Sequence, residues 1–308
     1  MGRYVLRRLL QLIPVFLGTT FLIYVLVWTI PGDPFAGQCG DRACPDAYIT
    51  EMREKFNLDE PLLVQYGSYL LRLVQGDFGE TFSGIEVSEL IAAAYPVTLK
   101  LALVALVIEM VIGGIAGILT GLRNRGFLDN LVLVSTLFLI SIPVFVTGFV
   151  LQFLFGLRWG IIEPTVSSQA RLTELIVPGF VLGSLSMAYV ARLTRASIAE
   201  HKRSDYVRTA VAKGLTPGRV AGVHVLRNSA IPVITFLGTD LGALMGGAIV
   251  TEGIFNIRGI GGLIFGAITT KEGATVVGAV TLLVIVYLLM NLLVDVLYAV
   301  LDPRIRYD

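Results

Sequence analysis

Charged residues are scarce in this chain. They make up only 15% of its 308 residues, whereas soluble domains carry about 25%. Hydrophobic residues make up 55% of the chain, and its mean hydropathy is +0.78. This composition predicts an integral membrane protein. The formal net charge of +1 leaves no basic excess to neutralise phosphates, which argues against a nucleic-acid partner.

Cysteine and histidine are also rare. The chain has two cysteines, Cys39 and Cys44, and two histidines, His201 and His224. Because no cluster of these residues has the spacing of metal ligands, we expect no metal site. The two cysteines are compatible with a small disulfide and equally with two unbridged thiols.

Motifs for catalysis and nucleotide binding are missing. The sequence contains no Gly-x-x-x-x-Gly-Lys-Ser/Thr, no Gly-x-Ser-x-Gly and no His-Glu-x-x-His. The glycine-containing stretch GLTPGR (214–219) lacks the lysine and the hydroxyl of a phosphate-binding loop. We therefore expect no enzyme and no cofactor held by this chain.

Long apolar runs are what the chain has in abundance. A run of about 20 residues is long enough, at 1.5 Å per residue, to cross the hydrocarbon layer. The sequence therefore predicts an all-α integral membrane fold with six transmembrane helices. They are expected near Leu9–Ile30, Val97–Leu119, Leu131–Phe155, Leu175–Leu193, Ser229–Val250 and Ala274–Val300. Pro143 and Pro232 remove backbone hydrogen bonds within two of these spans, which predicts a kink at each, either a fixed bend or a hinge.

The distribution of charge predicts the orientation. Most of the 24 Lys and Arg residues fall in segments that share a side with both termini, which the positive-inside rule places in the cytoplasm. The segment between the first two spans is acidic and is expected outside. After Pro61 it carries Leu62, Leu63, Tyr66, Tyr69, Leu70, Leu73 and Val74 at helical spacing. This pattern predicts an amphipathic helix that packs on the membrane face of the protein.

A basic stretch between the fourth and fifth spans predicts two short helices joined by a tight corner. Ser204 or Asp205 can cap the first helix, and Gly214 suits the left-handed residue that ends it. Thr216 can cap the second helix, with Pro217 at its first position.

Two interpretations of this corner remain open. A basic loop can serve only to set membrane topology. Alternatively, small residues allow another protein to approach closely while basic residues supply charge around the contact. The small residues are Thr209, Ala210, Ala212 and Gly214, and the basic ones are Arg208, Lys213 and Arg219.

Three carboxyl groups fall within expected spans: Glu109, Asp240 and Asp295. A charge there costs about 2.5–3.5 kcal/mol on insertion scales, so these groups must face protein or water. They either line a transport pathway or pack between helices, and the packing interpretation is favoured for Asp295. The glycine-rich stretch NIRGIGGL (256–263) is expected outside, either as a re-entrant turn or as a surface loop.

Several stretches resemble one protein family. Arg208-Thr209-Ala210, followed after three residues by Gly214, looks like the Glu-Ala-Ala-x-x-x-Gly loop of binding-protein-dependent ABC importer permeases. Arg208 replaces the family's Glu and Arg227 replaces its Pro, as is typical of the dipeptide, oligopeptide and nickel group. Further matching stretches are IPGDP (30–34), GDFG (76–79), TEGIFNIRGIGGL (251–263) and LDPRIRY (301–307).

This resemblance implies the type I ABC importer permease fold in a bacterial inner membrane. It implies a heterodimer with a second homologous permease, two ATP-binding subunits or domains that hold ATP and Mg, and an external substrate-binding protein. The implied segments are a first span (1–30), an outside segment (31–95), a permease core (96–300) with its coupling loop (194–228), and a tail (301–308). The residues implied to contact the ATPase are Arg208, Thr209, Ala210, Ala212, Lys213, Gly214, Leu215, Pro217 and Arg219.

The resemblance marks the coupling machinery and not the cargo. Short peptides are the expected cargo, and nickel, glutathione-like peptides and haem-type compounds are alternatives. An ion-coupled secondary transporter is a further alternative, because carboxylates within spans suit ion coupling. It is disfavoured because the two halves of the sequence show no inverted symmetry. A passive scaffold, the last alternative, would not need the corner for transport.

Overall fold

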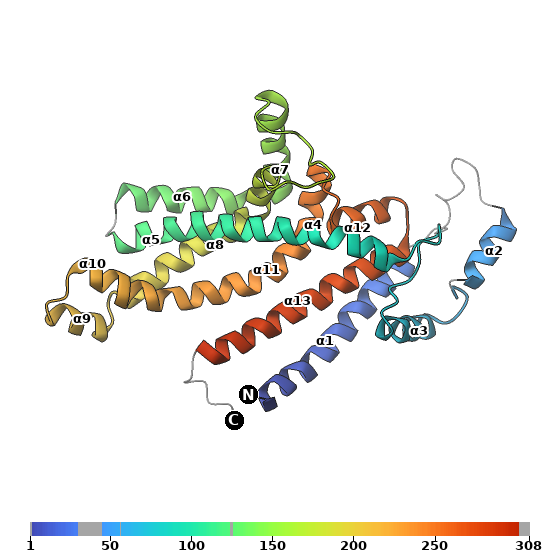
Figure 1. Ribbon diagram of the computed structural model, residues 1–308, viewed down its shortest axis with the longest axis horizontal. Helices are drawn as coiled ribbons and strands as arrows, with labels where there is room; N and C mark the ends of the chain where they lie inside the picture. Colours follow the sequence, from blue (N-terminus) through green and yellow to red (C-terminus); the bar gives the residue numbers. More distant parts are fainter. Residues whose placement is uncertain (1, 30–44, 56, 124–125, 302–308) are drawn as a thin grey trace.

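The computed structural model describes residues 2–29, 45–55, 57–123 and 126–301. Within these ranges the chain is helical and forms no strand beyond one isolated bridge between Glu80 and Glu86 (Figure 1). The α-helices are α1 (Gly2–Trp28), α2 (Asp46–Lys55), α3 (Leu62–Val74), α4 (Val87–Ile108), α5 (Gly114–Leu122), α6 (Phe127–Ser141), α7 (Val144–Leu151), α8 (Ile176–His201), α9 (Asp205–Ala212), α10 (Pro217–Arg219), α11 (Arg227–Phe255), α12 (Ile260–Thr269) and α13 (Gly273–Leu301). Three π-helical segments, η1 (Glu109–Gly113), η2 (Gln152–Arg158) and η3 (Val220–Leu226), adjoin them.

Five helical segments are long and apolar enough to cross a membrane: Val5–Trp28, Val87–Leu122, Ile176–His201, Pro217–Phe255 and Gly273–Val296. Each overlaps one of the expected spans. Two of them, Val87–Leu122 and Pro217–Phe255, are 36 and 39 residues long and extend well beyond the expected apolar stretches. Hydropathy detects only the apolar part of a helix, so the polar extensions were missed.

The remaining expected span, Leu131–Phe155, is not one helix. Asp129–Ser141 and Val144–Arg158 meet at a bend of 100°, and Figure 1 shows α7 rising away from the line of α6. Pro143 disfavours the helical conformation of the residue before it, and Ile142 is extended, with φ −98° and ψ 126°. The expected kink is therefore a break. α11, by contrast, continues through Pro232 without interruption.

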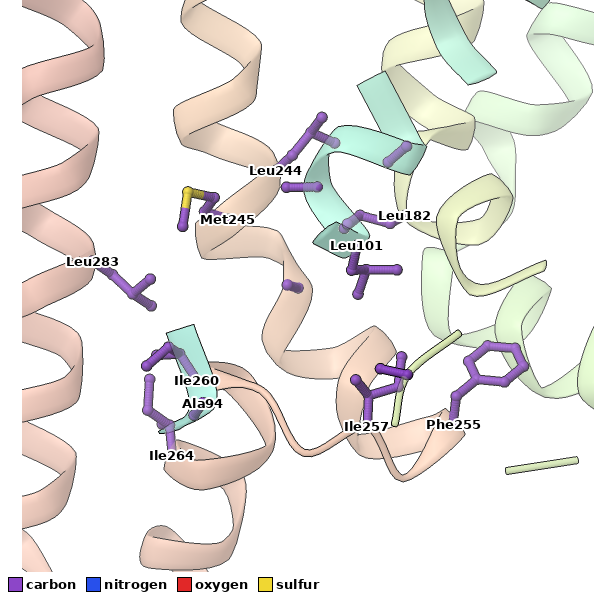
Figure 2. Close-up of a cluster of buried hydrophobic side chains, with 14 of the residues drawn as sticks. Ala94, Leu101, Leu182, Leu244, Met245, Phe255, Ile257, Ile260, Ile264 and Leu283 are labelled. Carbon is purple, nitrogen blue, oxygen red and sulfur yellow. The ribbon is translucent and has the colours of Figure 1, made fainter. Parts of the chain in front are cut away.

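The largest hydrophobic core lies where α4, α8 and α11 pack together, with α12 and α13 on one side. Leu101 of α4, Val181 of α8 and Ala248 of α11 are fully buried in it. Figure 2 shows Leu101 and Leu182 next to Leu244 of α11, and Leu283 of α13 directed toward Ile260 of α12. α8 contacts α4, α5, α6, α7 and α11 and is the central helix of the fold.

α5 approaches α8 closely because glycines face it. A Cβ atom built at Gly117 would lie 2.5 Å from the Cβ of Thr194 and 2.6 Å from the carbonyl oxygen of Ala191. Small residues at such contacts allow two membrane helices to pack backbone against backbone. Gly117 therefore serves helix packing. Gly114, one position beyond η1's end, faces open space, with no atom within 4 Å of a Cβ built there.

We expect Gly117→Leu to destabilise the protein by about 1–3 kcal/mol, the usual cost of overpacking a close contact. The leucine side chain would push α5 away from α8, which also supports the corner that follows α8. The measurement is thermal unfolding of the purified protein in detergent. Gly114→Leu, on the same helix, is the control and should leave the midpoint unchanged. Equal midpoints for the two variants would contradict this account of the contact.

α1 and α13 pack side by side, and α3 lies across them. The Tyr66 hydroxyl donates to the Leu17 carbonyl (2.9 Å) and lies 2.8 Å from the Thr20 hydroxyl, and the Tyr69 hydroxyl donates to Thr281 (2.8 Å). Burial raises the pKa of Tyr69 to about 12. The expected amphipathic helix is therefore confirmed, and it packs on the C-terminal half of α1. Its outer face includes Leu63 and Val74.

Candidate functional site

Residues 204–226 form the helical corner that the sequence predicts. α9 ends at Ala212, and Gly214 takes the left-handed conformation, with φ 79°. The Gly214 amide donates to the Val211 carbonyl (2.9 Å) and the Leu215 amide to the Ala210 carbonyl (3.3 Å). These two bonds are the Schellman arrangement that closes a helix C-terminus. The corner is thus a defined structure and not an open loop.

Ser204 and Thr216 occupy the expected N-cap positions, but their side chains do not form the expected capping hydrogen bonds. Ser204 and Thr216 precede α9 and α10, and both have extended backbone angles. Neither side chain caps its helix. The Ser204 hydroxyl instead donates to the His201 carbonyl at the end of α8 (2.6 Å). Ser204 therefore ties the corner to α8.

The outward surface of the corner contains most of the expected contact residues. Ala210 is an exception, because it is 5% exposed and packs inward, and Leu215 is half-buried. Val211 was missed, although its side chain is 59% exposed. Helix periodicity explains the exposure of Val211, since Val207 and Ala210 lie on the buried face of α9. The exposed contact residues are Arg208, Thr209, Ala212, Lys213, Gly214, Pro217 and Arg219.

The inward side of the corner is packed on the ends of α5 and α8. Ile198 of α8 is fully buried there, among apolar side chains of α5, α9 and η3. The Lys202 ammonium donates to the Leu122 carbonyl at the end of α5 (2.9 Å). Arg195 of α8 forms a two-point ion pair with Asp129 of α6, at 2.6 and 2.8 Å. A force on the corner would therefore act directly on α5 and α8, and on α6 through the Arg195–Asp129 pair.

The three expected carboxyl groups have two different environments. Asp295 of α13 pairs with Arg8 of α1, with 3.4 Å between Oδ2 and Nε, so it joins two helices. Glu109 is fully buried and Asp240 is 9% exposed. These two side chains neighbour each other, with Ser186 beside Asp240. The structure thus brings two of the three carboxyl groups together in the interior.

A fourth acidic residue, Glu252 near the end of α11, was missed. It is fully buried. Its Oε1 accepts a hydrogen bond from the Thr98 hydroxyl of α4 (2.7 Å), and its Oε2 accepts one from the Gly262 amide of α12 (2.8 Å). The Thr98 hydroxyl in turn accepts from the Ile260 amide (2.7 Å). Glu252 and Thr98 together hold the first turn of α12 against α4 and α11. The sequence signal that could have identified Glu252 is an acidic residue next to a glycine-rich stretch.

The stretch 256–263 forms a turn and not a loose surface loop. Asn256 ends α11 in the left-handed conformation, and the chain turns back into the ten-residue helix α12, which is too short to cross a membrane. Gln152 of η2 donates to the Ile254 carbonyl (2.8 Å), and the Val166 amide donates to the Phe255 carbonyl (3.0 Å). The end of α11 therefore anchors several segments around a cavity of about 590 Å³.

Some expectations fall outside the described residues. Cys39, Cys44 and the IPGDP stretch lie within 30–44, and nearly all of LDPRIRY lies within 302–308. Among the residues that the structure does describe, no group of three or more His, Cys, Asp or Glu side chains could hold a metal ion.

Comparison with known families matches almost the whole chain. Residues 113–307 match the binding-protein-dependent transport system inner membrane component, and residues 1–102 match the N-terminal region of the same kind of membrane component.

Full-length relatives carry transport names. The dipeptide transport system permease protein DppB of Alkalihalophilus pseudofirmus is 35% identical over 99% of both chains. The di/tripeptide transport system permease protein DppB of Pseudomonas aeruginosa is also 35% identical over 99% of both chains. The glutathione transport system permease protein GsiC of Escherichia coli is 37% identical over 100% of both chains.

Proposed function

This chain belongs to the family of binding-protein-dependent transport system inner membrane components, and we propose that it imports short peptides by forming half of a translocation pathway. As a member of this family it is a non-catalytic, multi-pass permease subunit of an ABC importer in the inner membrane. The helical corner of residues 204–226 is the observation that carries the proposal. It offers an exposed surface of small and basic residues on a base fixed to α5, α6 and α8.

The corner receives the movement of the ATPase. Ala212 and Gly214 are small and exposed and so allow close approach, while Arg208, Lys213 and Arg219 supply charge at the rim. Displacement of the corner passes to α5 and α8. Because α4, η1 and α5 form one continuous helix, Val87–Leu122, it then reaches the opposite end of the membrane domain. Rigid helices driven in this way would alternate access to the pathway.

We assign the partner proteins to the two ends of the molecule, which lie on opposite sides of the membrane. The end with the corner is cytoplasmic, as are both termini, because the basic residues concentrate there. Two ATP-binding subunits or domains dock on that side, and ATP and Mg are bound by them. A second, homologous permease completes the pathway, and an external substrate-binding protein docks at the end that carries α3 and α12.

The cargo is proposed from the relatives. The three relatives named above are transport permeases for dipeptides, di- and tripeptides, and glutathione, which is itself a short peptide. No group of ligands suited to a metal ion occurs among the described residues. Nickel and haem-type compounds remain the alternative cargo, carried by the same machinery.

We expect cells that contain this chain to take up labelled di-, tri- or oligopeptides when an uncoupler collapses ion gradients and ATP is maintained. The reason is that ATP hydrolysis, and not an ion gradient, drives this kind of importer. Cells that lack the chain are the control and should show no such uptake. Uptake that stops with the uncoupler while ATP stays high would support the secondary transporter. Uptake of nickel or haem, with no peptide dependent on the chain, would contradict the proposed cargo.

A further inference from the structure

Two carboxyl groups meet in the middle of the membrane domain. Glu109 begins η1, and Asp240 lies halfway along α11. Each is near the centre of its expected span, Val97–Leu119 or Ser229–Val250, and therefore near the bilayer midplane. Glu109 is fully buried and Asp240 is 9% exposed. Substrate sites of alternating-access transporters commonly lie at this depth, because both sides of the membrane can reach it in turn.

The pair is only partly satisfied by the protein, through the mutual contact of Glu109 and Asp240 and the contact of Asp240 with Ser186. Both carboxyl oxygens of Glu109 and Oδ2 of Asp240 lack a hydrogen-bond partner among the described residues. None of the ion pairs within the described part of the chain involves either residue. The charged neighbour of Glu109 is Asp240 itself, which is a like charge. Buried polar groups without partners are rare and call for an explanation, such as a functional role or a bound water or ion.

The pair borders a cavity. Asp240 and Ser186 line a cavity of about 260 Å³ between α7, α8 and α11, and all its other lining residues are apolar or small. Gly247 and Ala243 of α11 and Leu182 of α8 belong to its walls. The cavity thus has one acidic position with a hydroxyl beside it, and apolar walls that suit an aliphatic or aromatic side chain. Glu109 neighbours Asp240 but is not among the residues that line the cavity.

We propose that Asp240, supported by Glu109, binds the cationic amino terminus of the peptide cargo during translocation. A primary ammonium ion has three N–H donors and no acceptor, and the cavity offers it the unpartnered Oδ2 of Asp240 with the Ser186 side chain beside it. Its positive charge offsets the repulsion of two neighbouring carboxylates in a medium of low dielectric constant. Ser186 lies where it can contact the same group. This inference rests on the proposed function, because it names the part of a peptide that the pathway recognises.

The first test measures uptake by the complete complex in proteoliposomes, with its partner permease, ATPase and binding protein. We expect Asp240→Asn to lower the maximal rate of peptide uptake at least tenfold and Glu109→Gln to lower it as well. Both changes preserve shape and remove the charge. Asp240→Glu should restore most of the rate. Asp295→Asn is the matched control, since it removes a carboxylate that pairs with Arg8, and should keep the wild-type rate.

Two outcomes would overturn the proposal. One is uptake by Asp240→Asn within twofold of the wild type. The other is a loss that Asp240→Glu does not reverse, because the residue would then matter for its shape and not for its charge.

A second test does not depend on the cargo. An apolar carbodiimide adds to a carboxylic acid to form an O-acylisourea. An uncharged amine held beside this intermediate then attacks its acyl carbon, so that an amide bond forms and a urea leaves. With radiolabelled glycine ethyl ester as the amine, we expect label at Asp240 or Glu109, located by mass spectrometry and absent from the double variant Asp240→Asn/Glu109→Gln.

The two tests separate two kinds of failure. Label found only at other carboxyl groups, or no label at all, would overturn the ammonium site. Label at Asp240 in a complex that imports no peptide would support the ammonium site, and the proposed peptide cargo alone would be wrong.

Discussion

Replacing Glu252 by alanine is expected to release α12 and to lower transport at least tenfold. The change leaves the Gly262 amide without its acceptor and the Thr98 hydroxyl without one of its partners. Each unsatisfied buried group costs about 1–3 kcal/mol, so the first turn of α12 would no longer be held. Hydrogen exchange of residues 260–269, measured by mass spectrometry in lipid nanodiscs, should become faster. Peptide uptake by the same preparation should fall.

A graded series makes this prediction specific. Glu252→Gln should have a smaller effect, because its amide oxygen can accept from Gly262 while its NH₂ group donates to Thr98. Thr98→Val should match the alanine variant at α12, because it removes both the donor to Glu252 and the acceptor for Ile260. Glu272→Ala is the control, since the Glu272 side chain is partly exposed and accepts a hydrogen bond from the nearby Thr275 hydroxyl. If exchange and uptake of Glu252→Ala equal those of this control, Glu252 does not hold α12.

Introducing a charge at Ala212 is expected to abolish ATP-driven uptake, to below about a tenth of the wild-type rate, while the protein still inserts and folds. Ala212 is exposed in the last turn of α9 and takes no part in the buried cluster. Ala212→Glu therefore changes the surface that the ATPase is proposed to touch without disturbing the packing beneath it. An unpaired charge within such a contact costs several kcal/mol. The measurements are co-purification of the ATPase with this chain and peptide uptake in proteoliposomes.

The control for this variant carries the same substitution nearby. Ala199 is an exposed alanine in the last turns of α8, within the expected loop 194–228 but outside the corner of residues 204–226, so Ala199→Glu should co-purify and transport normally. Ala210 is unsuitable as a test position, because it is buried and a charge there would disrupt the corner itself. A complex with Ala212→Glu that retains its ATPase and imports peptide at the wild-type rate would remove the corner from the coupling mechanism.

The two predictions concern opposite ends of the same helices. The corner is fixed to α5 and α8, and Glu252 fixes α12 to α4 and α11. α4 and α5 belong to one continuous helix, which also carries Glu109. The carboxyl pair Glu109–Asp240 lies between the two ends, where α11 faces α8 and η1. Movement of the corner would thus reach both the proposed cargo site and α12 through connected, rigid elements.

The broken third span shows where reasoning from the sequence stopped. Pro143 predicts a change of direction, because it lacks an amide hydrogen and restricts Ile142. Its size, 100°, depends on how α7 packs against α8 and α11. Pro232 is the same residue type within a similar apolar run, yet α11 continues through it. Identical local chemistry therefore leads to different outcomes, since neighbouring helices decide whether a bend is accommodated.

The sequence by itself determined those features that depend on neighbouring residues in the chain. Apolar run lengths identify the spans, because crossing the hydrocarbon layer requires a fixed length of helix. The corner follows from Gly214, since a left-handed residue at the end of a helix favours glycine. Only the tertiary structure decided which buried acids share a site. Glu109 and Asp240 are far apart in the chain and meet through helix packing, whereas Asp295 reaches Arg8 and Glu252 reaches α12. Contacts between distant segments depend on how whole helices pack, and that geometry is not encoded in any local pattern.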